Sequence, residues 1–236
     1  RLDVPSKTSQ HRIDWLGAAL LVGAVSCLVL LTSWGGSRED WDSPIYGEFF
    51  DACIDLDLVP SFHILTSQAD ALNRTRGPKM NGFLSIIRGN QDLMGMFVLG
   101  GVFERHPRLK MVCVEADAGW APHFMYRMDH AYNRHRKWLT ANVSRPPSEY
   151  FAEHIYMTFQ DDFVAFRNAD QMNWRRLCWA NDFPHSDSTW PWSQEMLTQQ
   201  TQHLTPEQVK AILCDNVARF LAGKEPGFYR ITASRA

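Results

Sequence analysis

From residue 43 onward, short apolar runs alternate with longer amphipathic stretches of helical length. The apolar runs have the length of strands and lie at 59–65, 109–115, 154–159 and 177–182. Helices are predicted around them at 46–58, 80–103, 120–138, 163–172, 191–199 and 206–221. This alternation is typical of βα units, in which each helix returns the chain so that the next strand runs parallel to the last. The sequence therefore predicts an α/β fold with about four strand–helix units.

Residues 1–42 lack the alternation of strand-length and helix-length runs and are predicted to form a separate segment. The run from Trp15 to Trp34 contains no charged residue and has a tryptophan at each end. About twenty such residues can cross a bilayer as a helix, and tryptophans favour the two membrane interfaces. We therefore predict a single long apolar helix here with membrane contact, while a signal peptide fits less well because no cleavage site is evident. A buried helix of a soluble protein is the remaining alternative.

Charge and cysteine content indicate which kinds of partner and which cellular compartment suit the chain. Lys and Arg number 24 against 26 Asp and Glu, which gives a formal charge of −2 and no basis for nucleic-acid binding. The five cysteines are dispersed without a CxxC pair, as expected for reduced thiols in the cytosol. The part from residue 43 is therefore predicted to be cytoplasmic and to act on a small molecule, with membrane anchoring only if the N-terminal segment is genuine.

Polar side chains stand where the predicted strands end. His63, Glu115 and Asp182 end the first, second and fourth strand, and Thr158 and Gln160 end the third. In barrels of βα units, reactive groups project from the carboxyl ends of the strands. Histidine and carboxylate are ligand types suited to a divalent metal, which would activate a water or polarise a substrate oxygen.

Each candidate has an alternative interpretation. His63 could be a core residue, and Glu115 could cap the helix that starts near Gly119. Asp182 is the strongest candidate, because an apolar strand is a costly place for a bare carboxylate. His185 follows closely and could support it or contact substrate. Four other histidines are predicted to lie at the surface, namely His106, His130, His135 and His203. The sequence does not decide whether His123 and His154 are buried or exposed.

Four motifs carry a family resemblance: SFHILT (61–66), GVFERHPRLK (101–110), VEADAGWAP (114–122) and WANDFPHSDSTWP (179–191). Together they resemble the amidohydrolase-related family that includes aminocarboxymuconate-semialdehyde decarboxylase and the resorcylate-type decarboxylases. The resemblance implies the last half of a distorted (β/α)₈ TIM barrel with one divalent metal, most often zinc. It implies hydrolysis or non-oxidative decarboxylation of a small carboxylate-bearing or aromatic compound.

The resemblance also implies residue roles. His63 matches a metal ligand, Asp182 a metal ligand that also acts in catalysis, and Glu115 a catalytic acid–base position where several relatives have histidine. The matching substrate-binding positions are Trp120, Arg127, His185 and Trp190. A pair of front-strand metal ligands, often His-x-His, is absent from the sequence. We therefore expect a truncated or fused gene product that is an enzyme by family, or alternatively a catalytically inactive, membrane-anchored remnant. A half-barrel leaves open sheet edges, which favours a homo-oligomer.

The N-terminal segment has a resemblance of its own. The stretches RIDWLGAALL (12–21), SWGG (33–36) and WDSP (41–44) resemble one spanning segment of a major-facilitator drug exporter. Such transporters form their pathway from paired repeats of many helices. One helix cannot do so, and transport is not predicted.

Overall fold

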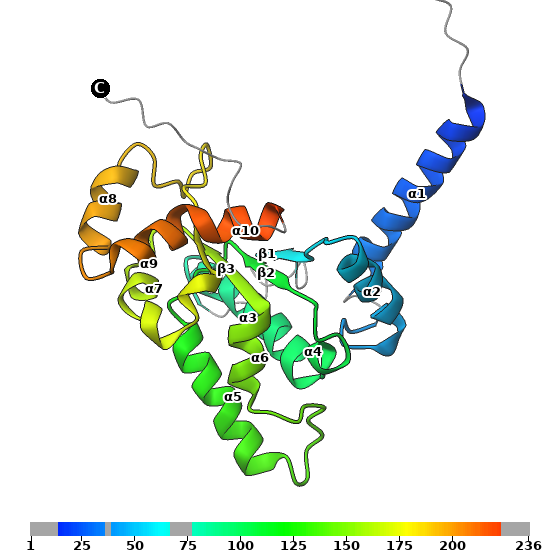
Figure 1. Cartoon of the computed structure of the whole chain (residues 1–236), viewed down its shortest axis with the longest axis horizontal. Coiled ribbons are helices and arrows are strands. Elements are labelled where there is room, and N and C mark those ends of the chain that lie inside the picture. The colour runs from blue at the N-terminus through cyan, green and yellow to red at the C-terminus, as the bar shows by residue number, and fades with distance from the viewer. Residues whose placement is uncertain (1–13, 36–38, 67–76, 223–236) are drawn as a thin grey trace, which may run out of the picture. The chain divides into compact units, whose positions relative to one another are not determined.

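The computed structural model describes residues 14–35, 39–66 and 77–222, and the chain separates into two units, Arg1–Asp40 and Trp41–Ala236. In the first unit, helix α1 (Trp15–Trp34) forms where the apolar run predicts a helix (Figure 1). The Asp14 carboxylate caps it by accepting a hydrogen bond from the Gly17 N–H at 2.9 Å. Within the described residues, no helix combines the length and apolarity that a membrane crossing requires. The predicted transmembrane span is therefore not supported.

The second unit is built on a four-stranded parallel sheet. Its strands are β1 (Ser61–His63), β2 (Met111–Val114), β3 (Ile155–Phe159) and β4 (Leu177–Trp179), which pair in that order. All three pairings are parallel. Parallel strands in sequential order are the arrangement of half a (β/α)₈ barrel. The predicted α/β fold with four strand–helix units is confirmed.

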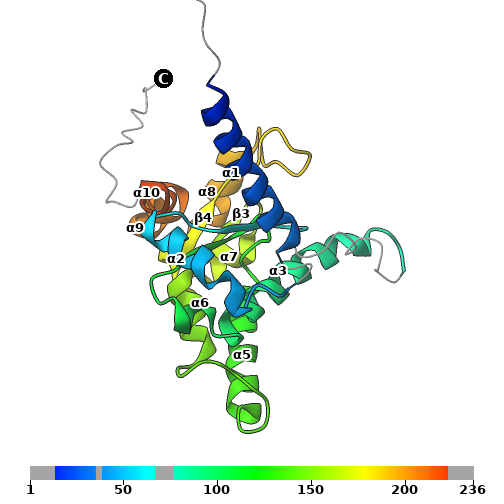
Figure 2. The same ribbon diagram turned by 90° about the vertical axis from the view of Figure 1, so that its right-hand side faces the viewer.

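Helices cover this sheet. They are α2 (Gly47–Asp55), α3 (Asn81–Leu99), α4 (Val102–Arg105), α5 (Ala121–His135), α6 (Pro147–His154), α7 (Phe163–Arg167), α8 (Ser193–Gln200), α9 (Pro206–Lys210) and α10 (Asn216–Ala222). Short turns of 3₁₀ helix lie at Pro44–Tyr46, Ala169–Gln171 and Trp174–Arg176, and a π-helical turn at Ala211–Asp215 joins α9 to α10. Figure 2 shows α5 and α6 side by side below the sheet.

Two differences from the predicted helices have local causes. The expected helix at 80–103 divides into α3 and α4, because Gly101 between them has φ +75°, which no residue of a right-handed helix adopts. A side chain does not fit at Gly101, since its Cβ would lie 2.2 Å from the Asn142 carbonyl oxygen. Helix α6 was not predicted, although Pro147 occupies its first position, where proline costs no hydrogen bond.

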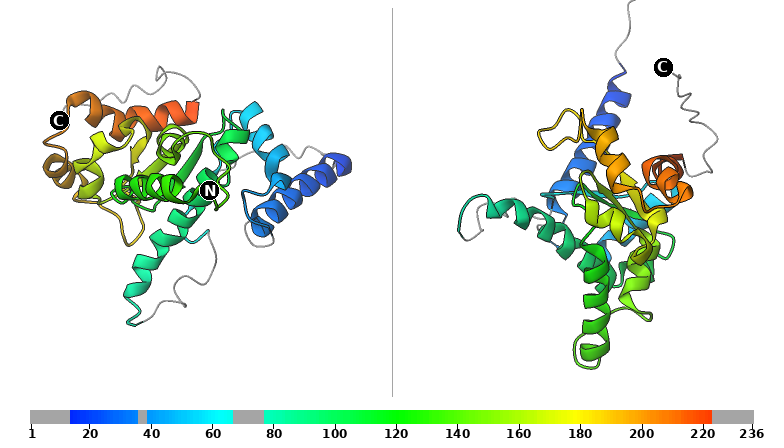
Figure 3. Two further views of the ribbon diagram at one scale, coloured as in Figure 1. Left: turned by 90° about the horizontal axis from the view of Figure 1, so that it is seen from below. Right: turned by 90° about the vertical axis from the view of Figure 1, so that its left-hand side faces the viewer.

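The two faces of the sheet pack against different helices. Successive side chains of a strand point to opposite faces. Phe62 of β1 lies on the face covered by α3, where its ring packs against that of Phe97 with centroids 5.2 Å apart. Asn90 of α3 also donates a hydrogen bond to the Phe62 carbonyl oxygen at 3.0 Å. On the other face, Val112, Tyr156 and Cys178 form a buried cluster against which Val217 of α10 packs. Figure 3 shows α10 and α3 on opposite sides of the sheet.

His106 was predicted at the surface, and the structure corrects this. Its ring is 8% exposed and packs against Phe50, with ring centroids 5.6 Å apart. Its Nδ1 lies 2.8 Å from an Asp51 carboxylate oxygen. Apolar neighbours therefore bury the ring, and an acidic partner satisfies it. His154, which was left open, is also buried.

Candidate functional site

Side chains converge at the carboxyl ends of the strands. His63 is the last residue of β1, and Glu115 follows the last residue of β2. The parallel pairing of these two strands places His63 opposite Val114, so the two side chains project from the same edge. The His63 Nε2 atom lies 2.5 Å from a Glu115 carboxylate oxygen. The sheet thus joins two groups that are far apart in sequence.

The backbone fixes the His63 ring. Its Nδ1 lies 2.8 Å from the Ile64 carbonyl oxygen. A carbonyl oxygen only accepts hydrogen bonds, so Nδ1 donates and Nε2 is directed at Glu115. A backbone carbonyl on one ring nitrogen is the usual means of orienting the other nitrogen of a metal-ligating histidine.

Glu115 is held from two sides. Its backbone N–H donates a hydrogen bond to the Thr158 hydroxyl oxygen of β3 at 2.8 Å. Its φ of +59° lies in the left-handed region, as do the φ angles of Asp117 in the same turn, Leu65 after β1 and Asp182 after β4. Non-glycine residues held there cost on the order of 1–3 kcal/mol each and cluster at functional sites. Residues in this conformation therefore follow three of the four strands, and Glu115 and Asp182 are two of them.

Asp182 and His185 complete the cluster with Glu115. One ligand atom from each of these three residues lies within 4.8 Å of the other two. The His185 Nδ1 is 3.0 Å from Asp182 Oδ2. Their angles do not make a hydrogen bond, so that buried carboxylate oxygen has no hydrogen-bond partner.

The donor chemistry of this cluster fits a divalent cation. A buried carboxylate oxygen that makes no hydrogen bond is costly, and a cation beside it would lower that cost. Imidazole nitrogens with carboxylate oxygens are an accepted ligand set for zinc and manganese. The groups that could hold such a cation are those of Glu115, Asp182 and His185, and His63 contacts this set through Glu115.

Two further carboxylates follow the ends of β2 and β3, and the sequence analysis did not identify either. Asp162 accepts hydrogen bonds from the Ala118, Gly119 and Ala165 N–H groups at 2.8, 2.7 and 2.9 Å. It thereby fastens the turn after β2 to the start of α7. An aspartate directly before a helix was the available signal. Asp117 is partly buried, and burial, with repulsion from Asp162, raises its pKa to about 6.

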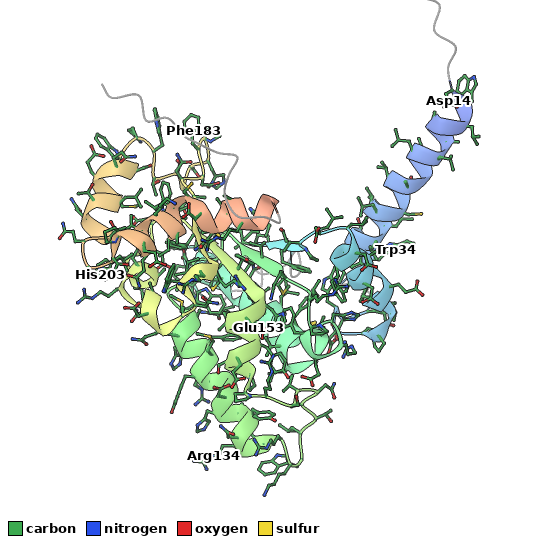
Figure 4. The ribbon with its side chains drawn as sticks, viewed as in Figure 1. Asp14, Trp34, Arg134, Glu153, Phe183 and His203 are labelled. Atoms are coloured by element: carbon green, nitrogen blue, oxygen red, sulfur yellow. The ribbon has the colours of Figure 1, made fainter. Side chains whose placement is uncertain are left out.

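Of the four predicted substrate-binding residues, one contacts the cluster and the other three have different surroundings. His185 contacts Asp182, as described above. Trp120 is turned into the helical layer, where its indole N–H donates to the Ala116 carbonyl oxygen at 2.7 Å. Arg127 lies exposed on α5. Trp190 is 59% exposed and packs edge-on against Phe183, with ring centroids 5.0 Å apart (Phe183 is labelled in Figure 4). The roles of these four residues stay predictions.

Comparison with known proteins points to one family for most of the chain. A family model described as Amidohydrolase matches residues 4–222. The structure is similar to 5-carboxyvanillate decarboxylase from Sphingomonas paucimobilis, with a TM-score of 0.65 and 22% identity over 79% of this chain and 56% of that one. It is also similar to an amidohydrolase from Mycobacterium avium subsp. paratuberculosis, with a TM-score of 0.64 and 18% identity over 76% of this chain and 46% of that one.

A third similar structure contains a metal. It is a dihydroxybenzoic acid decarboxylase from a Polaromonas species with bound manganese and the inhibitor 2-nitroresorcinol. Its TM-score is 0.56 and its identity 20%, over 80% of this chain and 57% of that one. These likenesses show the fold, and the chain spans about half the length of the solved structures it resembles.

Short matches connect the chain to transporters. An efflux pump from Gibberella fujikuroi is 51% identical over 35 residues, which are 15% of this chain and 6% of the pump. A major-facilitator-type efflux pump from a Fusarium species is 49% identical over 37 residues, 16% of this chain and 7% of the pump. These short matches agree with the exporter resemblance of the N-terminal segment.

Proposed function

Because the chain belongs to the amidohydrolase family, we propose that its second unit carries part of the centre of a metal-dependent enzyme that removes a carboxyl group from, or hydrolyses, a small carboxylate-bearing or aromatic compound. The observation that carries the proposal is the Asp182 Oδ2 atom, which is buried without a hydrogen-bond partner among histidine and carboxylate groups. The family implies a divalent metal, and we propose zinc or manganese. Manganese is the ion bound in one similar structure.

Asp182, Glu115 and His185 would hold the ion, with His63 beside them. When bound, the ion supplies a Lewis acid that polarises a substrate oxygen or activates water. The protein's own contribution is orientation. The Ile64 carbonyl oxygen aims the His63 ring, and the Thr158 hydroxyl oxygen fixes the Glu115 backbone.

We further propose that Glu115 moves a proton during turnover. Its carboxylate oxygen is 2.5 Å from His63 Nε2, which is within proton-transfer distance. It stands where several relatives have a catalytic histidine, so a carboxylate–histidine pair would do the work of that one side chain. The half-exposed His63 ring leaves this pair open to substrate.

Two observations support an aromatic substrate. The Phe183 and Trp190 rings stand exposed on the turn that carries Asp182 and His185, and they offer an apolar wall for a flat ring. The structure of a decarboxylase with 2,6-dihydroxybenzoate bound is among those that share this fold.

Strands β1 and β4 each have one neighbour within the described residues, and such edges favour pairing with a second copy. The free cysteines favour a cytosolic setting.

The test is metal binding by the full chain, measured by calorimetry with Mn²⁺ and Zn²⁺. We expect about one ion per chain and at least tenfold weaker binding in Asp182→Asn, because a ligand is neutralised. Asp92→Asn on α3 is the matched control, since this exposed aspartate lies outside the cluster. Equal affinity in Asp182→Asn and the wild type would refute the metal assignment.

Turnover is tested separately with 2,6-dihydroxybenzoate, by measuring CO₂ release from the metal-loaded chain. Release that is abolished in Asp182→Asn and Glu115→Gln but kept in Asp92→Asn would support decarboxylation. Metal binding without CO₂ release or hydrolysis would instead favour the alternative of a catalytically inactive relative.

A further inference from the structure

A cavity lies at the amino ends of the strands, away from the carboxyl ends that carry Glu115 and Asp182. It has a volume of about 170 Å³ and is bordered by Val59 before β1, Lys110 before β2 and Tyr156 near the start of β3. Lys110 and Glu115 flank β2 at its two ends, so roughly 17 Å of strand separates this cavity from the cluster of Glu115, Asp182 and His185. Glu153, labelled in Figure 4, marks the amino end of β3 next to it.

Positive charge dominates the walls of this cavity. Arg108, Lys110 and Arg219 border it, against the single carboxylate of Asp57. The buried Nε of Arg219, on α10, has no hydrogen-bond partner. An arginine nitrogen left unpaired in a buried position is costly, because no water replaces the missing acceptor.

The other cations have neutral or exposed partners. The Lys110 ammonium group donates to the Glu153 carbonyl oxygen at 3.1 Å, and Arg108 meets Asp55 at 3.4 Å, where both side chains are largely exposed. Arg176 adds further positive charge behind the wall, since it stacks on the Tyr156 ring and donates to its hydroxyl oxygen at 3.0 Å. Burial and the charge of Arg176 lower the pKa of Lys110. The wall of the cavity therefore carries more cationic than acidic side chains, and one of these cations, Arg219, keeps a buried nitrogen without a hydrogen-bond partner.

The cavity also has an apolar side. Ile54, Leu58 and Val59 border it together with the cationic groups. Arginine and lysine are the groups that proteins use for phosphate and carboxylate. We propose that this cavity binds a small organic anion, with its phosphate or carboxylate group at Arg219 and Lys110 and its apolar body against Ile54 and Leu58.

Calorimetric titration of the full chain with butyl phosphate tests the proposal. We expect saturable binding that weakens at least fivefold in both Arg219→Gln and Lys110→Gln. Arg175→Gln is the control with the same loss of charge, because Arg175 is exposed and pairs with Glu207 at 3.4 Å outside the cavity. Inorganic phosphate should bind more weakly than butyl phosphate, since it lacks the apolar body.

A second comparison separates this cavity from the metal cluster. Asp182→Asn, titrated with EDTA present, should bind butyl phosphate like the wild type. Loss of binding in Asp182→Asn, with retention in Arg219→Gln and Lys110→Gln, would assign the anion to the other end of the strands and overturn the proposal. Equal weakening by Arg175→Gln, or no saturable binding by the wild type, would overturn it as well. Circular dichroism identifies any variant that fails to fold, and the other cavity variant then decides.

Discussion

At the scale of single residues, Asp117 links the site to the stability of the fold. Its pKa is raised from 3.8 to about 6, so the folded chain binds this proton more tightly than the unfolded chain. The ionised form therefore opposes folding, and stability falls as the pH rises from about 4 to about 6. We expect Asp117→Asn to raise the free energy of unfolding at pH 8 by on the order of 2 kcal/mol and to change it little at pH 4.

Urea denaturation of the metal-free chain at the two pH values measures this effect. Asp92→Asn serves as the control and should shift neither curve, because Asp92 is exposed. A gain of equal size at pH 4 and pH 8 would show that ionisation of Asp117 is not its cause.

At this scale the sequence identified His63, Glu115 and Asp182 as candidates. It could not reveal their left-handed or hydrogen-bonded geometry, because that depends on neighbours from other strands.

At the scale of elements, the turn after β2 packs closely against the start of α7 because Gly119 in that turn has no side chain. A Cβ on Gly119 would lie 2.6 Å from both the Asp162 carboxylate and the Val164 Cβ. We expect Gly119→Ala to lower the free energy of unfolding by about 1–3 kcal/mol, because the crowded atoms must move apart. Gly95→Ala in α3 is the matched control, since its Cβ would be 3.4 Å from the Phe124 ring and alanine favours a helix. Equal denaturation midpoints for Gly119→Ala and wild type would contradict the close packing.

The elements also show what a sequence pattern can predict. The four strands were predictable because each is a compact apolar run between helical stretches. Their ends were not, since the apolar run at 59–65 continues past His63 into a turn that leaves the sheet. The predicted helix at 206–221 contains a π-helical turn at Ala211–Asp215, which side-chain periodicity does not report. The convergence of Glu115, Asp182 and His185 depends on the parallel pairing of strands, which only the fold supplies.

At the scale of the whole molecule, the division of the chain falls before Trp41. Trp41 is 5% exposed and packs against Tyr46 and Phe62, with ring centroids 4.6 and 5.4 Å away. The carbonyl oxygen of Asp42 accepts a hydrogen bond from Arg105 at 2.6 Å. Two residues that the sequence pattern assigned to the N-terminal segment thus supply contacts to the core of the second unit. We therefore propose a boundary at 40/41 in place of 42/43.

This boundary predicts a difference between two shortened chains. A chain of residues 39–236 should keep the unfolding midpoint of the second unit. A chain of residues 43–236 should lose about 3 kcal/mol or more, because removal of a buried tryptophan leaves a large cavity. Urea denaturation followed by circular dichroism measures both. In the full chain, Trp41→Ala should reproduce the loss, whereas Trp192→Ala should not, since Trp192 is 70% exposed. If the two shortened chains unfold at the same urea concentration, Trp41 belongs with the N-terminal segment, and the aromatic cluster around it contributes nothing to the second unit.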